Sequence, residues 1–116
     1  MWVASSLSAP VTEIATFYFD GAPPDDAFES AKKCIEIIGK DAGENVLGWS
    51  YGITHEDIEK DGVKGKGAVL TVGWESKEAH MRARETQAFK DNIHMLRQTS
   101  KAVEMHHTRF LNFVAG

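Results

Sequence analysis

The sequence has a single cysteine, Cys34, among its 116 residues. One cysteine cannot build an internal disulfide framework, and such sparse use is typical of proteins from reducing compartments. No apolar run approaches the roughly 20 residues that a membrane-spanning helix needs. Residues 1–10 also lack the basic and long apolar regions of a secretory signal. These absences predict a cytoplasmic protein with no membrane partner.

Positive charge is also scarce. The chain has 13 Lys and Arg against 17 Asp and Glu, which gives a net charge of -4 at pH 7. Because a nucleic-acid-binding protein is more often basic, we expect no nucleic-acid partner. The sequence contains no CxxC and no HExxH motif, and the adjacent His106 and His107 point to opposite faces of a predicted strand. We therefore expect no protein-ligated metal, and the pattern gives no reason to expect a cofactor.

What is present is the composition of one globular domain. Hydrophobic residues make up 42% of the chain and charged residues 26%, which are ordinary values for a folded protein. The chain is too short for two domains that each have a comfortable core. Residues 1–10 are rich in Ser and Ala and show no periodicity, so we interpret them as a tail that only Trp2 could dock. Residues 11–116 then form a single domain.

Hydrophobic periodicity predicts four strands and two helices. Alternation typical of strands occurs over residues 11–19, 46–54, 68–74 and 103–111. Helical spacing occurs over residues 25–38 and 76–96, and the second helix has an irregularity at Thr86-Gln87. Residues 55–67 are polar and Gly-rich, and we interpret them, including the glycines of 61–67, as a flexible hairpin loop that could serve as a lid.

The resulting order, β-α-β-β-α-β, predicts an α+β fold of the ferredoxin-like type. In this arrangement four antiparallel strands lie in the order 4-1-3-2, and both helices cover one face of the sheet. The other face would carry Ile14, Thr16, Tyr18, Val69 and Thr71. That patch is too apolar to leave in water, so we expect a homodimer that pairs sheet to sheet.

Two short segments resemble the dimeric α/β-barrel superfamily. One is Gly73-Trp74-Glu75-Ser76-Lys77-Glu78-Ala79-His80, which is similar to the strand-to-helix junction of stress-responsive barrels and antibiotic-biosynthesis monooxygenases. The other is Thr86-Gln87-Ala88-Phe89, which resembles the break in the second helix of those proteins. The resemblance covers residues 11–113 and implies two ferredoxin-like protomers packed through their sheets. The superfamily includes monooxygenases, cyclases, isomerases, decarboxylases, haem-degrading enzymes and ligand sensors, so it narrows the fold more than the function.

The catalytic residues of these families do not carry over directly. A polyketide cyclase of the stress-responsive type uses a Tyr on the second helix and a His just beyond it, where this chain has Ala83 and Phe89. The monooxygenases commonly carry a His in this helix, where this chain has Ala83 and Ala88. Neither catalytic set is therefore present at the aligned positions.

One pair of positions does agree with the cyclase. There a His on the first strand faces an Asp on the last strand, and the aligned residues here are Glu13 and His107, with acid and imidazole exchanged. The first and last strands are neighbours in the predicted order, so Glu13 and His107 can touch. A carboxylate there would raise the pKa of His107 and fix its tautomer, which suits acid–base catalysis. A one-residue slip would place Ile14 and His106 in the pocket instead.

We therefore predict a small cofactor-independent enzyme of the cyclase, isomerase or lyase type. Its substrate would be an apolar, polyketide-like or aromatic molecule, and Glu13 and His107 would move protons at an enolisable carbon. One alternative is a cofactor-free monooxygenase of phenolic substrates, and another is a non-catalytic ligand-binding or stress-related dimer. The residues predicted to shape the substrate pocket are Ala15, Phe17, Ile35, Leu70, Val72, Trp74 and Met105.

Overall fold

The computed structural model describes residues 5–111, so Trp2 lies outside the described part of the chain. Its single sheet contains β1 (Val11–Tyr18), β2 (Val46–Lys60), β3 (Val63–Trp74) and β4 (Ala102–Thr108). All pairings are antiparallel, and the order is β2-β3-β1-β4. This is the predicted order 4-1-3-2 viewed from the opposite edge, so the ferredoxin-like fold is confirmed.

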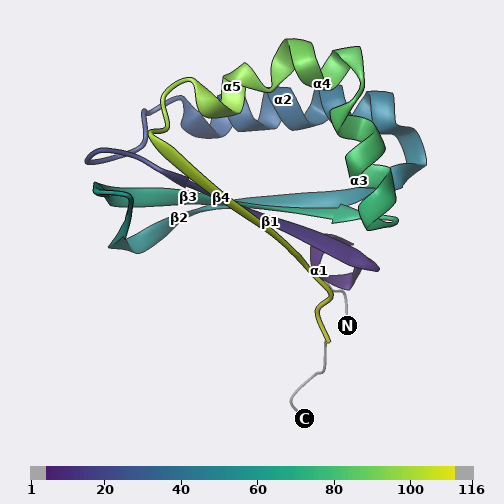
Figure 1. The fold of residues 1–116 in the computed structure, drawn as a ribbon, viewed down its shortest axis with the longest axis horizontal. Helices are drawn as coiled ribbons and strands as arrows, with labels where there is room; N and C mark the ends of the chain where they lie inside the picture. The colour runs from purple at the N-terminus through teal and green to yellow at the C-terminus, as the bar shows by residue number, and fades with distance from the viewer. Residues whose placement is uncertain (1–4, 112–116) are drawn as a thin grey trace.

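Four helices cover one face of the sheet (Figure 1). They are α2 (Ala27–Ala42), α3 (Lys77–Arg84), α4 (Gln87–Asn92) and α5 (His94–Arg97), and the short 3-10 helix η1 (Gly43–Asn45) joins α2 to β2. The predicted irregularity at Thr86-Gln87 is confirmed, because α3 ends at Arg84 and Thr86 caps α4. The Thr86 hydroxyl accepts a hydrogen bond from the backbone N–H of Phe89 at 3.2 Å, which starts a new helix in a new direction.

The prediction of a flexible loop over residues 55–67 is wrong. Strands β2 and β3 continue to Lys60 and Val63 and are joined by the two-residue turn Asp61-Gly62. Both turn residues have positive φ, 53° for Asp61 and 83° for Gly62, as the tight hairpin turn with matching twist requires. The long hairpin is therefore regular structure rather than a mobile lid.

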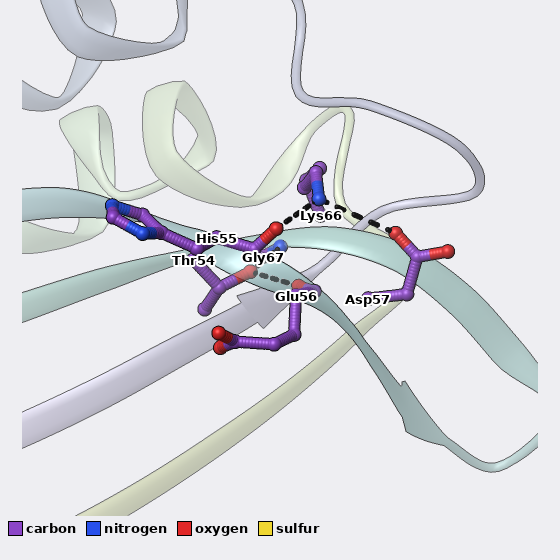
Figure 2. A network of polar contacts seen from close by, with 6 residues as sticks. All are labelled: Thr54, His55, Glu56, Asp57, Lys66 and Gly67. Carbon is purple, nitrogen blue, oxygen red and sulfur yellow. Dashed lines mark hydrogen bonds and ion pairs between the residues drawn. The ribbon is translucent and has the colours of Figure 1, made fainter.

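The register of β2 against β3 shifts near Thr54, which marks a bulge in the hairpin. The Thr54 hydroxyl accepts from the N–H of Gly67 at 2.9 Å and donates to the carbonyl of Glu56 at 2.7 Å. The ammonium group of Lys66 donates to the carbonyl of His55 (Figure 2). These bonds use the polar groups that the irregular pairing leaves free, so the bulge is a stabilised bend in the strand.

The face of the sheet opposite to the large helices is partly covered. A single helical turn, α1 (Ser5–Ser8), packs against β2 and β3. The Ser6 hydroxyl accepts from Thr71 at 3.2 Å and lies 3.3 Å from the Ser50 hydroxyl, and Thr12 donates to the Ser6 carbonyl. Part of the segment interpreted above as a tail is therefore attached to the sheet.

Candidate active site

An apolar cavity of about 90 Å³ lies between the sheet and the helices. Val72 does not line this cavity; its side chain is only 2% exposed and belongs to the hydrophobic core. The residues predicted to shape the pocket that do line the cavity are Ala15, Phe17, Ile35, Leu70, Trp74 and Met105.

The helices contribute cavity walls that the sequence analysis missed. Phe89, Ile93 and Leu96 line the cavity from the α4–α5 region, and their helical spacing was the available signal. A second cavity of about 60 Å³ shares Phe17 and Leu96 with the first, so these two side chains separate the two spaces. The other lining residues that were missed are Ile38, His80, Arg84, Arg97 and Val103.

Glu13 is the acidic group of this cavity. Alternation along β1 turns its side chain toward the helices, where the residue is only 9% exposed. Its Oε1 accepts a hydrogen bond from the indole Nε1–H of Trp74 at 3.0 Å. Burial raises the pKa of Glu13, while the Trp74 hydrogen bond and the charges of Arg84 and Arg97 oppose that rise.

His80 lies directly beside Glu13. Its Nε2 is 3.3 Å from Glu13 Oε1, and its Nδ1 is 2.7 Å from Nε2 of His107. The His80 ring stacks on Trp74 with centroids 4.6 Å apart and an interplanar angle of 19°. Ser76 fixes the start of α3 by accepting from the N–H of Ala79 at 3.0 Å, which places His80 in the first turns of that helix. Glu13, His80 and His107 thus form one chain of polar contacts, in which His80 and His107 are hydrogen-bonded.

The imidazole of His80 is uncharged at neutral pH. Burial, the neighbouring His107 and the charge of Arg84 lower the pKa of His80 to about 4. The pKa of His107 is also lowered, by burial and by the charges of Lys77 and Arg84. The contact between His80 and Glu13 therefore brings a neutral ring to the carboxyl group and is not an ion pair of two charged groups.

The predicted contact between Glu13 and His107 needs correction. The two residues are paired across β1 and β4 in the expected register, so both lie on the same face of the sheet, as predicted. However, both polar contacts pass through His80, and the pKa of His107 is lowered where a rise was predicted. His107 also does not line the cavity. The sequence analysis missed this role of His80, although its spacing with Ala83 indicated the inward face of α3.

The chain of three groups has two self-consistent protonation patterns. With Glu13 ionised, His80 carries its proton on Nε2, facing Glu13, and His107 Nε2–H donates to His80 Nδ1. With Glu13 protonated, His80 carries its proton on Nδ1 and donates to His107 Nε2, and His107 carries its proton on Nδ1. The second pattern holds one more proton than the first, and that proton enters or leaves at His107. The arrangement can therefore accept a proton in the cavity and exchange it at the far end.

The remaining chemistry of the described residues is limited. Residues 5–111 contain no group of three or more His, Cys, Asp or Glu side chains placed to hold a metal ion. None of the helices that the structure describes is long and apolar enough to cross a membrane. Cys34 is buried on α2, and burial raises its pKa to about 11, which makes its thiol a poor nucleophile.

Comparisons with known proteins identify the fold. No family model and no curated protein matches the chain. Among solved structures, SnoaB, a cofactor-independent oxygenase from Streptomyces nogalater, has a TM-score of 0.60 at 17% identity over 91% of this chain and 97% of that one. A putative antibiotic biosynthesis monooxygenase from Chloroflexus aurantiacus has a TM-score of 0.54 at 18% identity over 90% and 96%.

A dimeric ferredoxin-like protein of unknown function from Thermobifida fusca has a TM-score of 0.58 at 9% identity, over 86% of this chain and 90% of that one. Identities this low establish the fold alone. The predicted resemblance to the ferredoxin-like barrels is confirmed at that level.

Proposed function

We propose that this chain is a cofactor-independent enzyme that removes a proton from an apolar, oxygenated small molecule. The observation that carries the proposal is the chain of polar contacts Glu13–His80–His107, which begins at an otherwise largely apolar cavity. Glu13 supplies the carboxylate among the described lining residues, so it takes the proton. Its raised pKa brings a carboxylate closer to the range in which a general base works well at neutral pH.

The proposed step is a simple proton transfer. A C–H bond next to a carbonyl, or a phenolic O–H bond, breaks; the proton moves to the Glu13 carboxylate and the electron pair stays on the ligand as an enolate or phenolate. His80 holds the carboxylate in position, and His107 exchanges the proton with the surroundings. His107, predicted above as a catalytic residue, thus acts through His80 and is a positioning residue.

Two fates of the resulting anion correspond to two reaction classes. In a cyclase, isomerase or lyase, the enolate is reprotonated, attacks a carbonyl carbon or expels a leaving group, and no oxygen is consumed. In a cofactor-free monooxygenase, the anion of a phenol is the reductant: one atom of O2 forms a C–O bond at a ring carbon whose C–H bond breaks, the other atom leaves as water, and the ligand is oxidised to a quinone. The descriptions of the structural neighbours from Streptomyces nogalater and Chloroflexus aurantiacus support this second class as the alternative.

The size of the cavity limits how a substrate enters. Its volume of about 90 Å³ is below the roughly 150 Å³ of an engineered cavity that binds benzene and far below the roughly 300–1,000 Å³ of typical ligand pockets. Helices α4 and α5 contain no fully buried residue, whereas α2 and α3 each contain several, so the α4–α5 segment is the less firmly packed wall of the cavity. We propose that the α4–α5 segment moves outward when substrate binds.

Deuterium exchange tests the proton transfer directly. The protein is incubated in deuterium oxide with 2-tetralone, a bicyclic ketone with acidic C–H bonds, and deuterium uptake is measured by mass spectrometry. We expect Glu13→Gln to reduce catalysed exchange by about 100-fold or more, because it removes the base. His107→Ala should reduce it less, and Lys32→Gln, on the exposed side of α2, should leave it unchanged. Intact exchange in both Glu13→Gln and His107→Ala overturns the proposal.

Oxygen consumption separates the two reaction classes. The substrate is 1,4-dihydroxynaphthalene, and the rate is measured above that of buffer alone. Protein-dependent oxygen uptake that Glu13→Gln abolishes, with an oxygen atom of 18O-labelled O2 recovered in the product, favours the monooxygenase. Exchange into the ketone without oxygen uptake favours the cyclase, isomerase or lyase. Ligand binding with neither activity supports the non-catalytic dimer.

A further inference from the structure

Two arginines line the cavity that contains Glu13. Arg84 comes from α3, one helical turn beyond His80, and Arg97 is the last residue of α5. Arg84 is half-buried and Arg97 is exposed. Both charges act on Glu13 through space and oppose the rise in its pKa. A largely apolar cavity therefore carries two positive charges that act on its one carboxylate.

Neither arginine is paired within the described part of the chain. Among the side chains that the structure describes, the ion pairs within 4.0 Å involve Lys60, Lys66, His80 and His106 as the basic partners. A guanidinium group presents a planar fork of donors that matches a carboxylate. Two such groups at one cavity, without an acidic partner within that distance, leave donors available to a bound molecule.

We propose that the cavity takes a small molecule whose apolar body carries a carboxylate group, which Arg84 and Arg97 bind. This inference rests on the proposed function, because it assigns the substrate class of the same cavity. With Glu13 ionised, two arginines and one carboxylate leave one positive charge, which a ligand carboxylate neutralises. Transfer of a proton from the ligand to Glu13 leaves the total charge unchanged, so the same two arginines balance the site before and after the step.

Calorimetric titration with matched probes tests this assignment. Each pair has nearly the same shape and differs in charge: benzoate with benzamide, and 2-naphthoate with 2-naphthamide. We expect the carboxylate of at least one pair to bind about tenfold tighter than its amide, as charge-assisted hydrogen bonds allow. Arg84→Gln and Arg97→Gln should each lower carboxylate affinity by about threefold to tenfold and leave amide affinity unchanged. Arg82→Gln is the matched control, since Arg82 is exposed on α3 and does not line the cavity.

Three results overturn the inference: equal affinity for carboxylate and amide, a preference that survives both arginine substitutions, or no binding of either pair at millimolar concentration. The titration involves no turnover, so it fails independently of the deuterium exchange. Carboxylate preference without exchange leaves the ligand assignment standing and removes the proton transfer. Exchange without carboxylate preference leaves the proton transfer standing and removes the ligand assignment.

Discussion

At the scale of single residues, the site depends on a carboxylic acid and an imidazole kept in the dry interior. Burial acts on both in the same sense: it favours neutral Glu13 by raising its pKa and neutral His80 by lowering its pKa. Trp74 connects them, since its indole N–H donates to Glu13 while its ring stacks on His80. A residue predicted only as a pocket wall is thus the one that sets the geometry of both polar groups.

The pKa of Glu13 is raised and that of His80 is lowered, and these opposite shifts predict a specific pH dependence of stability. The unfolded chain protonates His80 near its ordinary pKa of 6.5, but the folded chain does so only near 4. Between these values the unfolded state binds more protons, so the free energy of unfolding falls as pH falls. Glu13 acts in the reverse sense: its pKa is raised above 4.5, so its contribution is present at low pH and is lost as pH rises through the raised value.

Urea denaturation at a series of pH values measures both effects. We expect a shallow profile for the wild type, because the two terms oppose each other. Glu13→Gln removes the contribution of Glu13 and keeps an acceptor for Trp74. The contribution of His80 is then unopposed, so the free energy of unfolding of this variant should fall by about 2–3 kcal/mol as the pH is lowered from 6.5 to 4. Adding His80→Gln should remove most of that slope and leave the smaller part due to His107. Identical profiles for wild type and Glu13→Gln contradict this explanation.

The sequence could predict which face of the sheet each strand residue of the site occupies. Alternation along a strand is a local property, so Glu13 and the apolar wall residues of β1 and β3 could be assigned to the inner face. The insertion of His80 between Glu13 and His107 depends on how α3 is rotated against the sheet. That rotation is set by tertiary packing, which no local pattern specifies.

At the scale of elements, the long hairpin depends on a close approach of two glycines. Gly21 donates to the carbonyl of Lys64 at 3.1 Å and accepts from the N–H of Lys66 at 2.8 Å. A Cβ at Gly65 would lie 2.1 Å from the carbonyl oxygen of Gly21 and 2.6 Å from its nitrogen. Because both obstacles are backbone atoms, one chain must move away before any side chain fits at position 65.

Gly65→Ala should therefore lower the free energy of unfolding by about 3 kcal/mol, in the range of severe overpacking. Gly52→Ala, in β2 of the same hairpin, is the matched control, since nothing lies within 4 Å of the point that a Cβ would occupy there; it should change stability by less than about 0.5 kcal/mol. Chemical denaturation of both variants measures the difference. Equal effects at the two positions would show that the Gly21 contact does not constrain the hairpin.

The same glycines explain why the sequence analysis failed at this element. Gly62, Gly65 and Gly67 within a polar segment were interpreted as flexibility, but only Gly62 serves the turn. Gly65 and Gly67 are buried, and they permit the close approach of Gly21 and of neighbouring chain atoms. The Asp61-Gly62 dipeptide was the correct local signal for a hairpin. The contact with Gly21 lies more than forty residues away in sequence and left no local trace.

At the scale of the whole molecule, the two faces of the sheet are covered unequally. Helices α2 to α5 cover one face (Figure 1). On the other face, α1 packs on β2 and β3, and Lys60 at the hairpin end pairs with Glu104 of β4 at 3.4 Å. Between these contacts Ile14 and Val69 remain only half-buried. A sheet with an apolar, partly open face favours association with a second copy.

We therefore expect a homodimer that forms through the outer face of the sheet. Val69→Glu should convert it to a monomer, because pairing would bury an unpaired carboxylate at a cost of several kcal/mol. Lys32→Glu is the control, since it also changes a charge but lies exposed on α2, on the opposite side of the sheet. Sedimentation equilibrium over a range of protein concentrations measures the association. A monomeric wild type, or a Val69→Glu variant that associates as strongly as the control, would exclude this face as the interface.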